Sequence, residues 1–167
     1  MSPMSLSKFR LSNERTVLIA IFLALAAFGA VLAYVALTST PGEGFISMYV
    51  LDSGKMAVNY PQSLVIGKNN TMHLWVGVGN FMGKAENCSV LVKIYNGTIQ
   101  KEPVPVDPVQ RYQKVLSDKD TWEFPVTMTL NQTGTVRVIF ELWLFGETGG
   151  LSYSGNSNSI WINVIRS

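Results

Sequence analysis

The sequence predicts an all-β immunoglobulin-like sandwich of seven or eight strands, tethered by one N-terminal transmembrane helix. Three observations support this prediction. A long run without charges lies near the N-terminus, stretches of alternating apolar and polar residues follow it, and turn residues separate these stretches at intervals of about ten residues. Antiparallel strands in this number, each with one buried face, pack best as two sheets. The pattern does not reveal the strand topology.

A transmembrane helix is predicted for residues 16–38, after a polar and basic tail at residues 1–15. The run from Thr16 to Leu37 has 22 residues and contains no charge, proline, asparagine or glutamine. As a helix it would be roughly 33 Å long, enough to cross the hydrocarbon core of a bilayer. Because backbone amides in lipid must be satisfied within the segment, a helix is the only single-pass solution. A buried helix of a soluble core is the alternative, but this run lacks the polar face that such helices need.

We expect this helix to stay in the mature protein. A cleaved secretory signal usually has an apolar run of about 7 to 15 residues, with small residues at the cleavage site after it. The run here is longer, and its best small pair, Val31 and Ala33, lies inside the run.

The charges on either side of the helix predict its orientation. Lys8, Arg10 and Arg15 precede it, with Glu14 as the only acidic residue there, whereas Glu43 is the first charge after it. Positively charged flanks stay in the cytoplasm. The sequence therefore predicts a cell-membrane protein with a cytoplasmic N-terminus and an extracellular C-terminal domain.

Small residues recur along one side of the predicted helix. Ala26, Gly29, Ala30 and Ala33 follow one another at spacings of three and four. Small residues so placed allow a second helix to approach closely, which favours a larger membrane-protein partner. The alternative is that alanine is simply common in membrane helices.

Residues 39–44 predict a linker, and residues 45–167 predict the extracellular β-sandwich domain. Pro41 ends the helix, and two glycines loosen the chain behind it. Apolar or alternating stretches closed by turn residues then predict strands at Phe45 to Leu51, Met56 to Tyr60 and Leu64 to Ile66, and strands that start near Thr71, Cys88, Phe124, Val136 and Ile160.

Two segments between these strands carry distinct signals. Asn96 and Gly97 form the dipeptide typical of a two-residue hairpin turn. Pro103, Pro105 and Pro108 then forbid a central strand and indicate an extended edge or a crossover.

Composition excludes one large class of partners. Beyond Ser39 the chain contains ten basic and ten acidic residues, so the domain lacks the basic surface of a nucleic-acid binder. Cys88 is the only cysteine, which excludes an internal disulfide. An outside domain without a disulfide is typical of a prokaryotic surface rather than of a small secreted eukaryotic module.

Four tripeptides in the predicted outer domain match the acceptor pattern for N-linked glycosylation. They begin at Asn69, Asn87, Asn96 and Asn131. Three lie in predicted turns, and Asn87 alternates with inward residues of its strand, so all four asparagines are expected to face solvent. Covalent N-glycans are thus predicted, with a turn-rich composition as the alternative explanation.

The sequence predicts no catalytic residue, no cofactor and no metal site. His73 is the only histidine, and one histidine with one cysteine cannot build an ordinary zinc site. The glycine-rich stretch from Gly77 to Ala85 fails both phosphate-binding patterns and is interpreted as a hairpin loop. The acidic residues show no calcium-loop spacing.

Aromatic residues indicate a possible docking face. Trp75, Trp143, Phe145 and Trp161 each alternate with the aliphatic set of their own strand. If these strands share one sheet, its outer face carries an aromatic patch, and exposed patches mark interaction surfaces. The alternative is that the domain's own loops cover these rings.

The sequence from Phe45 to Ile165 resembles the C-terminal outer domain of an archaeal membrane-protein family, domain of unknown function 1616. The resemblance is carried by the step Asn59, Tyr60 and Pro61, by a strand ending Val78, Gly79 and Asn80, and by the closing Trp161. It implies an archaeal cell surface and no enzyme. Larger members carry several membrane helices before this domain, whereas one is predicted here.

Three functional hypotheses follow. The first is a non-catalytic accessory subunit of an outward-facing membrane complex, such as cell-surface assembly or glycosylation machinery, for which oligosaccharyltransferase is one candidate. The second is a surface or filament component, pilin-like or envelope-anchoring, although residues 13–16 lack the pilin-type processing pattern. The third, an extracellular enzyme, has no supporting motif.

Overall fold

The computed structural model describes residues 7–38, 44–97, 101–146 and 149–167, without the side chains of residues 7–14, 36 and 38. The predicted linker therefore lies almost entirely outside the described residues. The chain forms two compact units, Met1–Gly42 and Glu43–Ser167.

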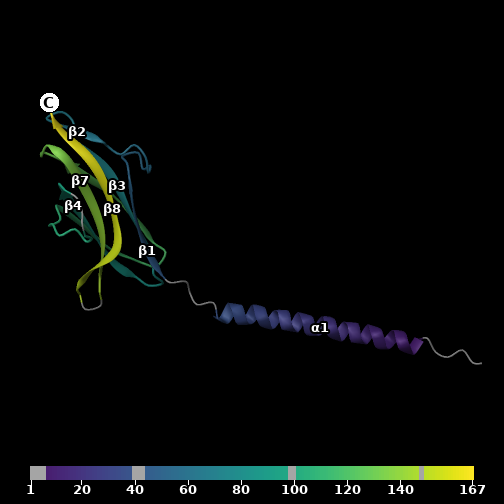
Figure 1. Cartoon of the computed structure of the whole chain (residues 1–167). Coiled ribbons are helices and arrows are strands. Elements are labelled where there is room, and N and C mark those ends of the chain that lie inside the picture. The colour runs from purple at the N-terminus through teal and green to yellow at the C-terminus, as the bar shows by residue number, and fades with distance from the viewer. Residues whose placement is uncertain (1–6, 39–43, 98–100, 147–148) are drawn as a thin grey trace, which may run out of the picture. The chain divides into compact units, whose positions relative to one another are not determined.

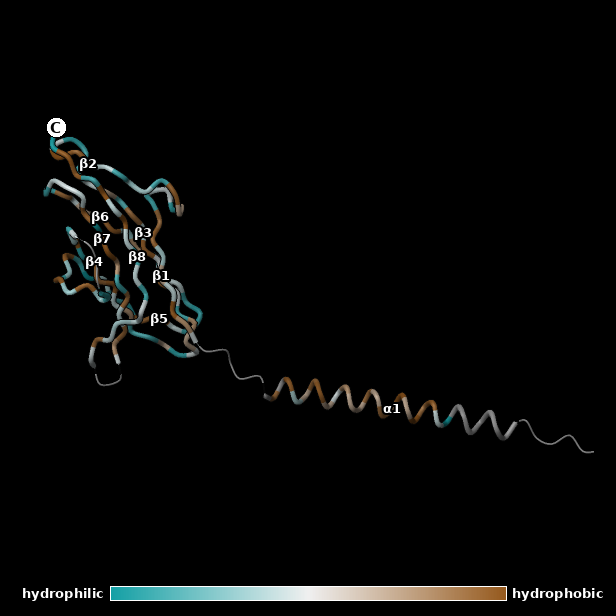
Figure 2. Tube along the Cα trace, viewed as in Figure 1, coloured by the Kyte–Doolittle hydropathy of each residue, from teal (hydrophilic) through white to brown (hydrophobic). Residues whose placement is uncertain are grey.

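The first unit contains the helix α1 (Ser7–Thr38), which begins within the basic tail. Its segment Arg15–Val35 is long and apolar enough to span a membrane, and none of it is buried within the structure. Figure 2 shows brown and pale colours along the coloured part of α1 after Arg15, whereas teal recurs throughout the strands. This unit matches the apolar helix that the sequence predicts.

The second unit is an immunoglobulin-like sandwich of two sheets, as predicted (Figure 1). The smaller sheet has the order β1-β3-β6 and the larger one the order β2-β8-β7-β4-β5. Neighbouring strands are antiparallel except β2 and β8, which pair in parallel. The strands are β1 (Phe45–Leu51), β2 (Ser63–Ile66), β3 (Thr71–Phe81), β4 (Glu86–Tyr95), β5 (Gln110–Leu116), β6 (Thr121–Thr129), β7 (Gly134–Phe145) and β8 (Leu151–Arg166).

The core lies between the two sheets and consists of the residues whose alternation predicted the strands. Successive side chains of a strand point to opposite faces, so every second residue enters the core. Its fully buried members include Val76 and Val78 on β3, Val90 and Val92 on β4, and Phe140 on β7.

Three predicted elements are wrong. The hairpin loop expected from Gly77 to Ala85 is shorter, because β3 continues to Phe81 and only residues 82–85 connect it to β4. Met56 to Tyr60 forms no strand, because Asp52 Oδ1 accepts hydrogen bonds from the backbone N–H groups of Gly54 (2.9 Å) and Met56 (2.8 Å) and so folds the start of the β1–β2 loop, residues 52–62. Asn96 and Gly97 do not form a two-residue hairpin. Residues 96–109 separate β4 from β5, and pairing resumes at Gln110, after the three prolines that cannot join a ladder.

One strand, β5, and the first half of another, β8, escaped prediction for the same reason, a polar composition. β5 carries mostly exposed polar residues, and the first half of β8 is rich in serine, asparagine and glycine. The β8 asparagines protect the free edge of β1: Asn156 Nδ2 donates to the Ile46 carbonyl (3.3 Å) and Asn158 Nδ2 to the Met48 carbonyl (3.1 Å). Exposed edge groups invite unwanted strand pairing, and these side chains satisfy them.

Tyr60 satisfies the next carbonyl along the same edge of β1. Its hydroxyl donates to the Val50 carbonyl at 2.7 Å. Asn59, the residue before it, has a positive φ of 57°, a backbone conformation that asparagine tolerates better than most residues. The motif Asn59, Tyr60 and Pro61 is therefore a device that turns the chain and covers the β1 edge.

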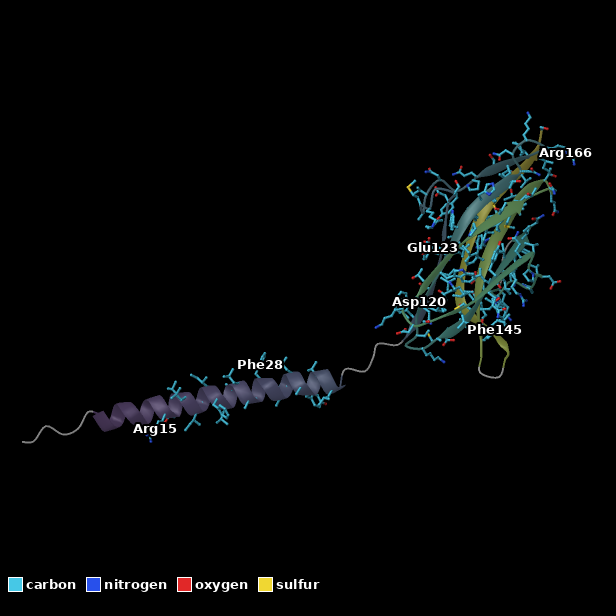
Figure 3. All side chains as sticks on the ribbon, turned by 180° about the vertical axis from the view of Figure 1, so that it is seen from behind. Arg15, Phe28, Asp120, Glu123, Phe145 and Arg166 are labelled. Atoms are coloured by element: carbon cyan, nitrogen blue, oxygen red, sulfur yellow. The ribbon has the colours of Figure 1, made fainter. Side chains whose placement is uncertain are left out.

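The two ends of the sandwich differ in what they contain. The chain enters at β1, and we call this the linker end; it holds Phe45, its cross-strand partner Phe81, and the end of β7 at Phe145. The opposite, distal end holds the start of β3 and the end of β8. Figure 3 shows Phe145 and Asp120 near the linker end and Arg166 at the distal end.

Candidate docking surface

The outer face of the five-stranded sheet is unusual because its centre is buried. Lys93 and Ser89 point away from the core, as predicted, and Leu91, Ile139 and Glu141 share their face. All five are nevertheless buried. Part of the cover is the proline-rich segment 101–109, whose Val104 is itself only 2% exposed. The three prolines thus mark neither an edge strand nor a crossover, but a segment that lies on the outer face.

A buried ion pair fastens this segment to the sheet. Lys93 Nζ lies 2.7 Å from Glu141 Oε2. Lys93 Nζ also donates to the Val104 carbonyl at 2.6 Å, and the Val104 N–H donates to Glu141 Oε1 at 2.6 Å. Trp143 Nε1 donates to Glu141 Oε2 at 3.1 Å. Both charges are thereby paired and hydrogen-bonded, which is the condition for burying them at tolerable cost.

A groove of about 640 Å³ opens beside this ion pair. Trp143 forms one wall, and Pro103, Pro105 and Val106 belong to the covering segment. The ring of Trp143 is half-buried and packs against Tyr153, with ring centroids 5.6 Å apart. Tyr153 in turn donates a hydrogen bond to Glu102 at 3.0 Å, so the wall and the segment are fixed to each other.

Towards the distal end, three large side chains form a row across β8, β7 and β4. Trp161 lies opposite Arg137, and Arg137 lies opposite Tyr95. We call these three residues the Trp161 row. The guanidinium of Arg137 lies 5.1 Å from the centre of the Trp161 ring, and its Nε donates to Ser159 Oγ at 2.9 Å. Trp161 is 50% exposed, so the row is ordered and accessible.

The predicted aromatic face is only partly assembled. Trp143, Phe145 and Trp161 belong to the five-stranded sheet, but Trp75 lies on β3 in the other sheet. Parity along single strands cannot show which strands share a sheet, and the condition of one shared sheet fails for Trp75. Its ring is covered by Lys55, whose Nζ lies 3.9 Å from the ring centre.

Lys55 belongs to a small charged cluster on the outer face of the three-stranded sheet. Its Nζ lies 2.9 Å from Glu123 Oε2, and the Tyr49 hydroxyl donates to Glu123 Oε1 at 2.8 Å. Hydrogen bonds from Lys55 and then Tyr49 lower the pKa of Glu123. Burial, followed by the hydrogen bond and charge of Glu123, raises the pKa of Tyr49 to about 12. The cluster attaches the β1–β2 loop to the sheet.

We expect this cluster to make stability depend on pH at both extremes. Because the folded-state pKa of Glu123 is lowered, its contribution is complete above the ordinary glutamate pKa and is lost as pH falls through the lowered value. Because the pKa of Tyr49 is raised, its contribution is complete below the ordinary tyrosine pKa and is lost as pH rises towards about 12. Unfolding midpoints measured against pH should show a shallower acid limb for Glu123→Gln than for the native protein. An unchanged acid limb would contradict this role.

The four glycosylation acceptors lie in two different settings. Asn69, Asn96 and Asn131 are exposed and lie towards the distal end. Asn70 Nδ2, in the tripeptide that begins at Asn69, donates to Asn131 Oδ1 at 2.7 Å, which joins two of the acceptor tripeptides. Asn87 lies on β4 near the linker end and is half-buried, contrary to the expectation that all four would face solvent alike.

The remaining predicted residues lie apart from these surfaces. His73 is exposed and contacts Thr127 Oγ1 through Nδ1 at 3.1 Å. Cys88 is fully buried, and burial together with the charge of Glu86 raises the pKa of its thiol to about 11. Among the described residues, no group of three or more His, Cys, Asp or Glu is arranged to hold a metal. The small helix residues Ala26, Gly29, Ala30 and Ala33 are all exposed.

Solved structures share this fold at low sequence identity. A β-glucosidase from Listeria innocua aligns with a TM-score of 0.51 and 12% identity over 73% of this chain, which spans 16% of the enzyme's length. The CARDB domain of a Pyrococcus furiosus protein aligns with a TM-score of 0.50 and 14% identity, over 74% of this chain and 96% of that domain. At these identities the likeness shows the immunoglobulin-like fold alone.

Sequence comparison is more specific. No curated protein matches the sequence. Residues 39–163 match the family described as domain of unknown function (DUF1616). This range covers the whole sandwich except its last residues, as the motifs around Tyr60, Asn80 and Trp161 predicted. The chain therefore belongs to the domain of unknown function 1616 family.

Proposed function

We propose that this protein is a non-catalytic, single-pass accessory subunit of an outward-facing membrane complex. In this proposal α1 anchors the chain, and the outer face of the five-stranded sheet binds a larger membrane protein. The single observation that carries the proposal is the Trp161 row, an accessible line of tryptophan, arginine and tyrosine on the sheet face where the buried ion pair holds the covering segment.

The residue types of this row support docking rather than solvation. Tryptophan, tyrosine and arginine are the residues that most often dominate the binding energy of protein interfaces. Arg137 is already held by Trp161 and Ser159, so little side-chain freedom remains to be lost when a partner binds. The neighbouring groove beside Trp143 adds a concave surface next to the row.

The helix supports the same proposal from the membrane side. The Arg15–Val35 segment is sufficient to span a bilayer, and the basic residues before it favour a cytoplasmic N-terminus. The exposed side with Ala26, Gly29, Ala30 and Ala33 provides a surface on which a partner helix can pack closely. Two contacts, one in the membrane and one outside, would then hold the subunit in its complex.

Affinity capture from native membranes tests the proposal with two matched tryptophan variants. Full-length tagged protein, solubilised in mild detergent, should recover large multi-span proteins in stoichiometric amount. Trp161→Ala should reduce that recovery by roughly tenfold or more, because removal of an interface hot spot costs about 2 kcal/mol or more. Trp75→Ala, on the other sheet, should leave recovery unchanged.

Two results would contradict the proposal. One is recovery that Trp161→Ala does not alter. The other is recovery with filaments or an envelope lattice instead of multi-span proteins, which would favour a surface component. Equal thermal unfolding of the two variants shows that the comparison reports docking and not misfolding.

The same orientation places the acceptors for N-glycosylation outside the cell. We expect Asn69, Asn96 and Asn131 to carry glycans, because they are exposed. We expect Asn87 to be unmodified in the folded protein, because the Ser89 hydroxyl of its tripeptide is buried and lacks a hydrogen-bond partner within the described structure. Mass spectrometry of peptides from native membranes measures all four. Glycan on Asn87, or on none of the four, would contradict the expectation.

A further inference from the structure

The linker end of the sandwich exposes two stacked phenylalanines. Phe45 begins β1, Phe81 ends β3, and the two are cross-strand partners. Their ring centroids are 4.8 Å apart, and the planes differ by 22°. Phe45 is 57% exposed and Phe81 is 38% exposed. A pair of large apolar rings thus faces solvent where the chain enters the domain.

The backbone around these rings explains why they cannot turn into the core. Asn80 occupies the inward position beside Phe81 and is fully buried in a network of hydrogen bonds. The ring of Phe81 folds back over Gly79, where an added Cβ would lie 2.9 Å from the ring. The exposed pair is therefore a fixed feature of the strand ends.

Two charged side chains of the turns at this end make contacts within the domain. Lys84 Nζ lies 3.3 Å from Glu86 Oε1. Asp118 accepts a hydrogen bond from the Gly83 N–H at 2.8 Å. The exposed ring pair itself is apolar, and an apolar partner suits it.

The short connection between α1 and β1 makes the membrane the partner that is always within reach. α1 ends at Thr38, and Phe45 begins β1 seven residues later. Even fully extended, seven residues span at most about 25 Å. If α1 crosses a bilayer, this connection sets the greatest distance at which Phe45 can lie from the end of the helix, so the interfacial layer of the lipid is within its reach.

We propose that Phe45 and Phe81 insert into the interfacial layer of the membrane that α1 spans. This inference rests on the proposed role of α1 as an anchor. Apolar rings gain free energy when they leave water for the boundary between headgroups and acyl chains. Insertion would fix the linker end on the lipid surface and hold the outer face of the five-stranded sheet at a defined height for its partner.

Depth-dependent fluorescence quenching of the full-length protein in phosphatidylcholine vesicles tests this inference. An environment-sensitive maleimide dye is placed at Lys84→Cys, beside the rings, and in separate samples at Phe28→Cys in α1 and at Asn131→Cys at the distal end. Cys88 is fully buried with a raised thiol pKa, so the dye reacts with the introduced cysteine. Lipids with a nitroxide at a shallow or a deep acyl position act as quenchers.

We expect strong quenching at position 28 by the deep quencher, quenching at position 84 by the shallow one, and none at position 131. Adding Phe45→Ser and Phe81→Ser should reduce quenching at position 84 by about half or more, because the rings hold the end in the lipid. Continued protection of Cys88 from the dye shows that this double variant is folded.

The outcomes separate the two proposals. Quenching at position 28 but not at position 84, or quenching at 84 that does not depend on the rings, would overturn the inference and leave the anchor intact. Absence of quenching at position 28 would overturn both.

Discussion

Lys93→Met is expected to destabilise the sandwich by about 3–5 kcal/mol, because it leaves the Glu141 carboxylate buried without its counter-charge. Glu141 is fully buried, and its two oxygens are committed to Lys93, Val104 and Trp143. The Val104 carbonyl would also lose its donor. Chemical unfolding of the full chain in detergent, followed by tryptophan fluorescence, measures the loss.

Two matched variants show whether burial is the cause. Lys55→Met breaks an ion pair of similar length, 2.9 Å, whose side chains are 47% and 32% exposed, and it should cost far less than Lys93→Met because solvent screens the exposed pair. The double variant Lys93→Met with Glu141→Leu removes both buried charges and should recover much of the stability lost in the single variant. A loss for Lys93→Met no larger than that for Lys55→Met would show that the buried pair does not fasten the covering segment.

The buried ion pair also shows what alternation along a strand cannot predict, namely whether an outward side chain is covered. Alternation on β4 and β7 correctly placed Lys93 on the face away from the core, and an outward lysine ordinarily implies solvent. Over Lys93 the cover comes from residues 101–109, a segment whose prolines exclude a central strand but give no indication of what it lies on. Nothing in the local sequence connects Val104 to Glu141, because the contact depends on how β4 and β7 pair.

The other structural features also divide into those that the sequence of one segment determines and those that depend on contacts between distant segments. The apolar helix, six of the strands and the inward residues of the core follow from periodicity within one segment. The assignment of Trp75 to a sheet, the pairing of β2 with β8 and the Trp161 row depend on strand order, which alternation does not encode. β5 and the first half of β8 were missed because hydrogen-bonding side chains such as Asn156 replace the apolar residues that signal a strand.

Asn80→Ala is expected to destabilise the sandwich by about 3 kcal/mol, because buried backbone groups lose their partners. Asn80 Nδ2 donates to the carbonyls of Lys84 (2.8 Å), Leu116 (2.9 Å) and Ser117 (3.2 Å), and its Oδ1 accepts from the Met82 N–H at 3.0 Å. One side chain thus joins the β3–β4 turn to the start of the β5–β6 turn. Thermal and chemical unfolding of the variant measure the loss.

An asparagine with an exposed hydrogen bond provides the control for this prediction. Asn70 makes an exposed bond to Asn131 at the distal end, so Asn70→Ala should cost well under 1 kcal/mol. Asn80→Asp retains the shape and the acceptor, but it turns a carboxylate oxygen towards three carbonyls and should be at least as damaging as alanine. If Asn80→Asp were as stable as the native protein, donation by Nδ2 would not be what holds the two turns. The Asn80 hydrogen bonds would then not explain why the sequence has the motif Val78, Gly79 and Asn80. They would also not explain how the linker end holds the exposed rings of Phe45 and Phe81.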